Sequence, residues 1–263
     1  MSTVNWLHPV SGDWNDAANW VGGRVPTAND DVIIPFAGIR VTHATFPVNS
    51  VHALISEAAL DISAGVLAVG ATSRIDDLCT ISGGTLSLTN CTLGGAGMLI
   101  NRGALDLFAS TINVGLRNET GLILTAGFGV TSAINNQSGQ PFVNGAGATL
   151  RVAGRTALTV AQGFTNEGRI DLQTTSRFLT QFVVANGMLV NAPGGTIDIA
   201  GDSLTSVTFS ADLDNEGLIN AGWATIGKPS GTVINGGTIA VGGQHLSGLI
   251  IGQSAFTNRG TIR

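Results

Sequence analysis

Short stretches in which apolar and polar residues alternate dominate this chain. In "GTIDI", Ile197 and Ile199 are predicted to face inward and Asp198 to face solvent, the period of two that a half-buried strand requires. A helix would need apolar residues at i, i+3 and i+4, and this spacing is absent. The pattern therefore predicts an all-β protein.

An asparagine, one or more small residues and a glycine precede each predicted strand. Both Asn and Gly tolerate left-handed backbone conformations, so this segment predicts a tight turn. Ser82 and Ser63 take the place of the asparagine in two further units upstream. The predicted turn asparagines are Asn101, Asn118, Asn144, Asn166, Asn191, Asn215, Asn235 and Asn258.

A repeat of about 22 residues cannot close a hydrophobic core alone, but it can if each unit forms one coil that stacks on the next. We predict a parallel β-solenoid of about ten coils over residues 41–263, right-handed because parallel connections usually are. Outward residues after the turn glycines, among them Asp171, Asp198 and Asn220, should stack in one column without a uniform ladder. An antiparallel sandwich or barrel is the alternative, although its strands should recur every 8 to 12 residues.

Residues 1–40 contain no repeat and hold three of the four tryptophans. An uncovered solenoid end would expose strand edges and apolar core, so solenoids need a terminal cap. We expect Trp6, Trp14 and Trp20 to form this cap, and "DDVIIP" from Asp30 to supply the first strand of the stack. Asp30 and Asp31 are interpreted as turn residues that start the strand, with half of a calcium site as the alternative.

The N-terminal motifs GxW, NW, GxxP and DDVxI are followed by "NSVHALISEAALDISAGVLAV" and by the NxG strands. This succession resembles the N-terminal portion of large exported bacterial β-solenoid proteins, which include adhesins of the autotransporter and filamentous-haemagglutinin kinds. The resemblance covers the whole chain as a pattern. It implies a bacterial protein, secreted or exposed at the cell surface, that works as a stalk, adhesin or scaffold. No secretory signal is visible in the first twenty residues, and an anchoring barrel is also lacking, so the export route stays open.

Composition argues against two classes of partner. Charged residues make up 11% of the chain, the net charge is −5, and Lys228 is the only lysine, so no basic stripe is available for nucleic acid. No apolar run reaches the ~18 residues that a membrane span requires. We therefore expect neither a nucleic-acid partner nor membrane insertion.

No acidic motif of the chain identifies a reaction. The chain lacks the NTD, GHG and RIK stretches of polygalacturonases, which are solenoids that cleave acidic polysaccharides. Asp212, Asp214 and Glu216 form the densest acidic patch and are interpreted as a solvated turn, whereas Asp76 and Asp77 stand alone as a pair. We expect no catalytic residue.

Histidines and cysteines give no metal-binding spacing either. His43 and His52 could meet on adjacent coils, although isolated histidines are the favoured interpretation. Cys79 and Cys91 are interpreted as buried thiols, with a disulfide as the alternative. We expect no metal and no cofactor. The four histidines are His8, His43, His52 and His245.

Two functions follow from these observations. The first is a non-catalytic structural or adhesive module of an extracellular or bacterial cell-surface protein, with host or matrix glycans as possible partners. The second is a carbohydrate-active or glycan-binding β-helix, which a shallow groove lined by converging acids and an arginine would favour. Ice binding or a role in a phage spike is a minor third possibility.

The stretch "FTNRGTIR" begins a coil at Asn258 and places Ile262 inward. An uncovered coil would leave unpaired backbone groups above an apolar core. We expect Ile262 and Arg263 either to be followed by more coils of a longer chain or to contact another subunit end to end, which would produce a filament.

Overall fold

The computed structural model describes residues 1–46, 48–136, 139, 141–174, 179–201, 207–242, 248–252 and 255–263. These residues form β-strands and one 3-10 helix, η1 (Ala17–Asn19), and none of their helices is long and apolar enough to cross a membrane. Two compact units are present: unit 1, Met1–Arg117 with Asn136–Gln140, and unit 2, Asn118–Asn135 with Pro141–Arg263.

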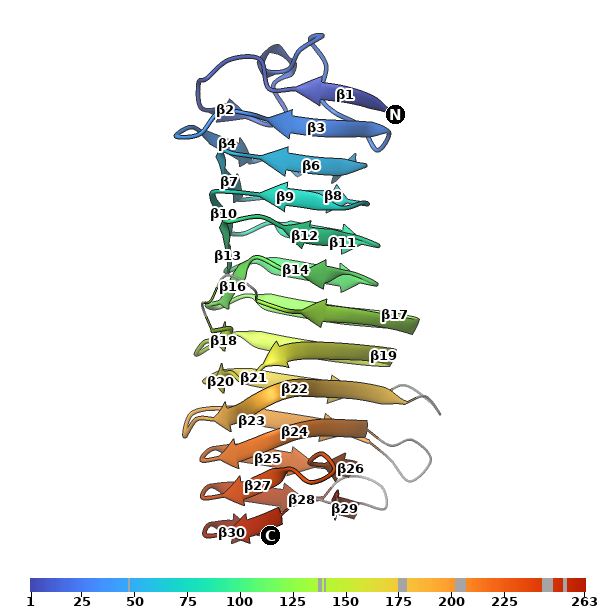
Figure 1. The fold of residues 1–263 in the computed structure, drawn as a ribbon, viewed down its shortest axis with the longest axis vertical. Helices are drawn as coiled ribbons and strands as arrows, with labels where there is room; N and C mark the ends of the chain where they lie inside the picture. Colours follow the sequence, from blue (N-terminus) through green and yellow to red (C-terminus); the bar gives the residue numbers. More distant parts are fainter. Residues whose placement is uncertain are drawn as a thin grey trace. The chain divides into compact units, whose positions relative to one another are not determined.

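Unit 1 is a stack of three-sided coils, and each side is a column of parallel strands (Figure 1). The first column holds β1 (Ser2–Asn5), β3 (Asp30–Ile34), β6 (Ala53–Ser56), β9 (Ser73–Ile75), β12 (Thr92–Gly94) and β15 (Thr111–Ile112). The second holds β2 (Gly12–Asp13), β4 (Arg40–His43), β7 (Ala59–Ile62), β10 (Leu78–Ile81), β13 (Met98–Asn101) and β16 (Gly115–Asn118). The third holds β5 (Val48–Val51), β8 (Val66–Val69), β11 (Thr85–Thr89) and β14 (Ala104–Phe108).

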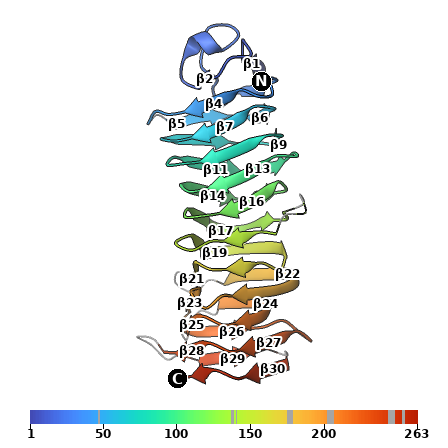
Figure 2. The ribbon, with the colours of Figure 1, turned by 90° about the vertical axis from the view of Figure 1, so that its left-hand side faces the viewer.

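Unit 2 repeats this arrangement with longer strands, several of which bend around a corner of the coil. Figure 2 shows β21, β23, β25 and β28 one below another, in agreement with their parallel pairing. The long strands are β17 (Leu122–Ile134), β19 (Thr149–Gln162), β22 (Thr180–Asn191) and β24 (Val207–Asn215). The short strands are β18 (Val143–Asn144), β20 (Thr165–Asn166), β21 (Arg169–Gln173), β23 (Thr196–Ala200), β25 (Leu218–Ala221), β26 (Trp223–Ile226), β27 (Thr232–Asn235), β28 (Thr238–Val241), β29 (Gly248–Ile251), β30 (Ala255–Asn258) and β31 (Thr261–Ile262).

The predicted fold class is confirmed, since the described strands form a parallel β-solenoid of about ten coils. Ile197 and Ile199 are buried and Asp198 between them is only half-buried, as the alternation predicted. The outward column also has the predicted register, because Asp171 pairs with Asp198 and Asp198 with Asn220. The antiparallel alternative is wrong.

The asparagines of the repeat do not occupy left-handed turns, so that part of the prediction is wrong. They are the last residues of their strands, and none has a positive φ. Asn101 ends β13 in unit 1, and all the repeat asparagines before Asn258 are buried. In unit 2 each side-chain amide donates a hydrogen bond to the amide oxygen of the next asparagine at 2.7 or 2.8 Å. This asparagine ladder runs through Asn118, Asn144, Asn166, Asn191, Asn215, Asn235 and Asn258.

Serine does not replace asparagine in the upstream coils, as the sequence had suggested. Ile81 pairs with Asn101 and with Ile62, so isoleucines occupy the ladder position of those coils. Ser82 and Ser63 follow that position and lie outside the strands. The ladder position therefore faces inward. In unit 1 it holds isoleucine in some coils, and in unit 2 it holds asparagine amides.

Close packing, and not a left-handed φ, requires most of the glycines that follow the repeat asparagines; Gly147, with a φ of +85° and open space around it, is an exception. A Cβ at Gly195 would lie 2.3 Å from the carbonyl oxygen of Asn166 in the preceding coil, and one at Gly217 would lie 2.3 Å from that of Gly195. Real Cβ atoms do not approach backbone oxygens this closely. Only glycine lets successive turns stack at the spacing of parallel strands.

The predicted tryptophan cap is confirmed. Trp6, Trp14 and Trp20 are buried, and the ring of Trp20 packs edge to face against Trp6 at 4.8 Å and Trp14 at 5.0 Å. The indole N–H of Trp20 donates to the carbonyl of Trp14 at 2.7 Å. One detail differs from the prediction, because β1 pairs with β3, so the strand that begins at Asp30 is not the first of the stack.

Candidate functional site

A charged cluster on the outward face of β19, β21 and β23 is the first candidate site. It lines a shallow groove of about 430 Å³ that includes Glu167, Arg169 and Asp198. The register of the parallel strands places Asp171 directly beside Asp198 on the neighbouring coil. Two stacked aspartates repel each other, so this pair requires compensating charge.

Two arginines supply that compensation. The Nε of Arg151 donates to Asp171 at 2.8 Å, and the Nε of Arg169 lies 2.7 Å from the carboxylate of Asp198. Asn220 donates a further hydrogen bond to Asp198 at 2.6 Å. Asp171 is only 1% exposed, so its carboxylate is shielded from a substrate in the groove. General acid–base catalysis needs a carboxyl group within hydrogen-bond reach of the substrate, and Asp171 does not meet this requirement.

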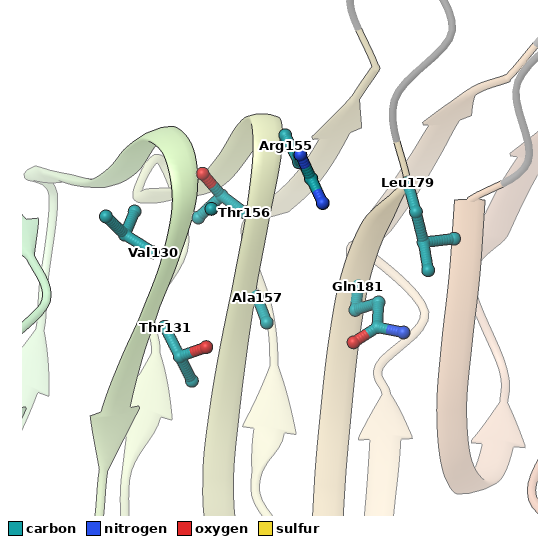
Figure 3. A pocket seen from close by; sticks show the side chains of 8 residues that line it. Val130, Thr131, Arg155, Thr156, Ala157, Leu179 and Gln181 are labelled. Atoms are coloured by element: carbon teal, nitrogen blue, oxygen red, sulfur yellow. The ribbon is translucent and has the colours of Figure 1, made fainter.

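A second groove, of about 260 Å³, lies where β17 and β19 bend around a corner of the coil (Figure 3). The corner in β17 is made by Gly129, which has a φ of +72°, at an irregularity in the strand register. Thr156 and Thr180 stabilise the bends by donating hydrogen bonds to the carbonyls of Gly127 at 3.1 Å and Gly154 at 2.7 Å in the preceding coils. These contacts fix the backbone around the groove.

Arg155 and Leu179 form the rim of this second groove, and Thr131, Ala157 and Gln181 form its floor. The guanidinium carbon of Arg155 lies 5.0 Å from the centroid of the Phe128 ring, which is 64% exposed. Sequence analysis missed these residues. The available signal was "AGFGV", where two glycines interrupt the alternation of apolar and polar residues in an otherwise regular strand.

The acidic patch near Asp212 is not a solvated turn, so that interpretation is wrong. Asp212 and Asp214 belong to strand β24, and only Glu216 follows its end. Lys228 forms an ion pair with Asp212 at 2.6 Å, and the hydrogen bond from Lys228 lowers the pKa of that carboxyl. The pair Asp76 and Asp77 is not isolated either, because Arg74 forms an ion pair with Asp76.

Asp30 anchors the cap. Its carboxylate accepts hydrogen bonds from Arg24 at 2.6 and 2.8 Å and from the backbone N–H of Thr27 at 2.8 Å. The hydrogen bonds from Arg24 hold the pKa of Asp30 well below its usual range. Asp31 pairs with His52 at 2.6 Å, so these two aspartates start β3 with protein partners, as the favoured interpretation held.

His43 and His52 have separate side-chain partners, Asn49 and Asp31, so each is held by its own coil contacts. His43 is buried, with Nδ1 2.8 Å from the carbonyl oxygen of Ala64 and Nε2 2.8 Å from the side-chain oxygen of Asn49. His8 is exposed, and His245 lies outside the described residues. Within the part of the chain that the structure describes, no three His, Cys, Asp or Glu side chains converge on a metal position.

Both cysteines are free and buried, so the disulfide alternative is wrong. Burial raises the pKa of the Cys79 thiol to about 12 and that of Cys91 to about 11. A thiol with such a pKa stays protonated at neutral pH, and it is the thiolate that reacts. Cys79 and Cys91 are therefore inert core residues.

The predicted end-contact residues lie on and after the last described strand. Ile262 pairs with the buried Ile239, and the backbone N–H of Arg263 donates to the carbonyl of Ile239 at 3.0 Å. Ile262 therefore continues an inward column, as predicted, and it is 47% exposed. Its proposed role in an end-to-end contact stays a prediction.

The fold and its surface define the class of this chain as a parallel β-solenoid. Comparisons with known protein families, curated proteins and solved structures gave no match. The resemblance to exported bacterial adhesins therefore stays a prediction, and function has to be inferred from the surface itself.

Proposed function

We propose that this protein is a non-catalytic structural or adhesive β-solenoid module of a secreted or cell-surface bacterial protein. The observation that carries the proposal is the charge pairing of the aspartates in and beside the first groove. Asp171 is buried against Arg151, and Asp198 is bound by Arg169 and Asn220. Carboxylates held in this way stabilise the stacking of coils, which is a structural role.

The asparagine ladder supports the structural part of this proposal. A continuous row of amide hydrogen bonds, buried except at Asn258, links every coil of unit 2 to the next. Because each amide is satisfied by its neighbour, the row stabilises the stack only while all coils stay in register. Such a scaffold presents its outward rows at a fixed spacing, which suits a stalk or an adhesive surface.

A carbohydrate-active β-helix is the second candidate function. Glu167 is exposed at the rim of the charged groove, near Arg169 and Asp198, so an acid and a base could both reach a glycan lying there. Under this alternative, Glu167 and Asp198 would be the catalytic carboxylates.

Incubation with acidic and neutral polysaccharides tests the two functions. We expect no new reducing ends and no unsaturated products, while the protein immobilised on beads retains some of these polysaccharides. Cleavage that disappears in both Glu167→Gln and Asp198→Asn would refute the non-catalytic proposal. The matched control is Glu57→Gln, which changes a carboxylate in unit 1 and should have no effect in either case.

A further inference from the structure

The floor of the second groove is a row of outward side chains on three neighbouring strands. Thr131 on β17, Ala157 on β19 and Gln181 on β22 lie beside one another (Figure 3). The small Ala157 leaves a hollow between a hydroxyl and an amide, and both of these groups donate and accept hydrogen bonds. The groove volume of about 260 Å³ is below the roughly 300–1,000 Å³ of enclosed small-molecule pockets. This shape suits one part of an extended ligand that lies along the surface.

Arg155 places a positive charge at the rim of this hollow. Its position over the Phe128 ring, 5.0 Å from the centroid, is a cation–π contact that orients the guanidinium. Among the described residues no carboxylate forms an ion pair with Arg155. The N–H groups at the edge of the guanidinium are therefore available to bind a carboxylate in the two-point geometry that arginine favours.

We infer that this groove binds an acidic oligosaccharide. Arg155 pairs with a carboxylate of the uronate type, and Thr131 and Gln181 hydrogen-bond to ring hydroxyls. The inference rests on the adhesive part of the proposed function and names its ligand class. Phe128 is a positioning residue, because it touches Arg155 and does not line the groove.

A peptide fits this surface less well. Peptides that bind β-sheets mainly add a strand to an unpaired edge, where main-chain hydrogen bonds supply the affinity. Strands β19 and β22 are each paired with a parallel strand on both sides, so their backbone groups are already used. The groove therefore offers side chains only, and these match the hydroxyl and carboxylate groups of an acidic sugar.

An oligomer of four uronic acid residues and its fully methyl-esterified form are the matched probes, since the ester keeps the rings and removes the charge. We expect calorimetry to show at least tenfold tighter binding of the acid form, as a charge-assisted contact to arginine implies. Arg155→Gln should lower the affinity for the acid form about tenfold and leave that for the ester unchanged. Arg259→Gln alters an exposed arginine outside the groove and should bind like the wild type.

Phe128 provides a second variant pair. Phe128→Ala should weaken binding of the acid form severalfold because the guanidinium loses its support, and Phe128→Tyr should restore it because the ring is kept. A melting temperature for each variant shows that the coil is intact. Equal weakening by the alanine and tyrosine variants would contradict the positioning role.

Three results would overturn the inference: no binding of the acid form, equal affinity for acid and ester, or an unchanged affinity in Arg155→Gln. Equally tight binding of an acidic peptide of the same charge would also overturn it. The chain length of the probe is measured in the same samples by mass spectrometry. Shortening of the probe would refute the non-catalytic proposal and leave the binding inference standing, so the two failures are distinguishable.

Discussion

Replacing Asn191 by leucine interrupts the asparagine ladder near its middle. The amide of Asn191 accepts a hydrogen bond from Asn166 at 2.8 Å and donates one to Asn215 at 2.7 Å. All three side chains are fully buried, so a group that loses its partner cannot bond freely to water instead. The leucine variant has nearly the same side-chain volume and keeps the packing, which isolates the effect of the amide.

The expected cost follows from counting the polar groups left without a partner. Asn191→Leu removes the ladder partners of one N–H of Asn166 and of the amide oxygen of Asn215. It also removes the longer hydrogen bonds from the Asn191 amide to the carbonyls of Gly195 at 3.4 Å and Leu218 at 3.3 Å. Each buried unpaired group costs about 1–3 kcal/mol, and the apolar leucine offsets part of the total, so we expect a loss of about 2–4 kcal/mol. Asn220→Leu, at an outward position, should cost under about 1 kcal/mol.

A double variant gives the sharper test. In Asn191→Leu combined with Asn215→Leu, the groups that lose a ladder partner are one N–H of Asn166 and the amide oxygen of Asn235, which is again two groups. The double variant should therefore lose about as much stability as either single variant, whereas independent sites would add. Strict additivity in this cycle would refute the ladder as a coupled network.

Urea unfolding followed by circular dichroism measures these free energies. Stacked repeats can unfold in segments, so native-state hydrogen exchange of the amides in β22 and β23 should accompany it. Protection should fall in these strands for Asn191→Leu and stay at the wild-type level for Asn220→Leu. A loss of stability no greater than that of the Asn220 control would contradict the magnitude worked out above.

Three further predictions address burial and titration. Ile197→Asp should cost several kcal/mol because it buries an unpaired charge. Asp198→Ser should cost under about 1 kcal/mol because it removes only a half-exposed ion pair. Similar melting temperatures for the two variants would show that the inward and outward positions are wrongly assigned. The folded state lowers the pKa of Asp30. The contribution of this carboxylate to stability is therefore fully present above the unfolded pKa of about 3.9 and is lost progressively as the pH falls below it. The melting temperatures of the wild type and Asp30→Asn should converge below about pH 4. A constant difference down to pH 3 would contradict this. Cys79 and Cys91 should react with a thiol reagent at pH 8 only after unfolding, and labelling of the native protein at the rate of free cysteine would show that they are accessible.

Alternation in the sequence was sufficient to predict the inward and outward residues, as Ile197 and Asp198 show. It also predicted the register of the outward column, because the turn glycines align one coil with the next. The second groove was not predictable in this way. It depends on a bend at Gly129 and on the approach of Arg155 to Phe128, which lie on neighbouring strands and are brought together only by the fold.

The role of the repeat asparagines was missed for a different physical reason. An asparagine followed by glycine is typical of a turn, and a buried ladder produces the same sequence pattern. What distinguishes the ladder is a contact between coils: an amide that both donates and accepts can satisfy an identical amide one coil away. The sequence of one repeat unit does not reveal the asparagine of the next coil. In the structure, the pairing of Asn101 with Ile81 shows that the position faces inward.

The ladder position holds isoleucine where the coils have one length and asparagine where their length varies. Ile62 and Ile81 are 19 residues apart and directly paired, whereas the ladder partners in unit 2 are separated by 20 to 26 residues. Coils of unequal length provide no constant spacing to set the register, and an apolar column tolerates displacement because dispersion contacts are not directional. A displaced amide loses both partners inside the core, which is a large and specific cost. We therefore attribute the asparagines to register control: the ladder keeps the strands of unit 2 aligned while the length of its coils varies.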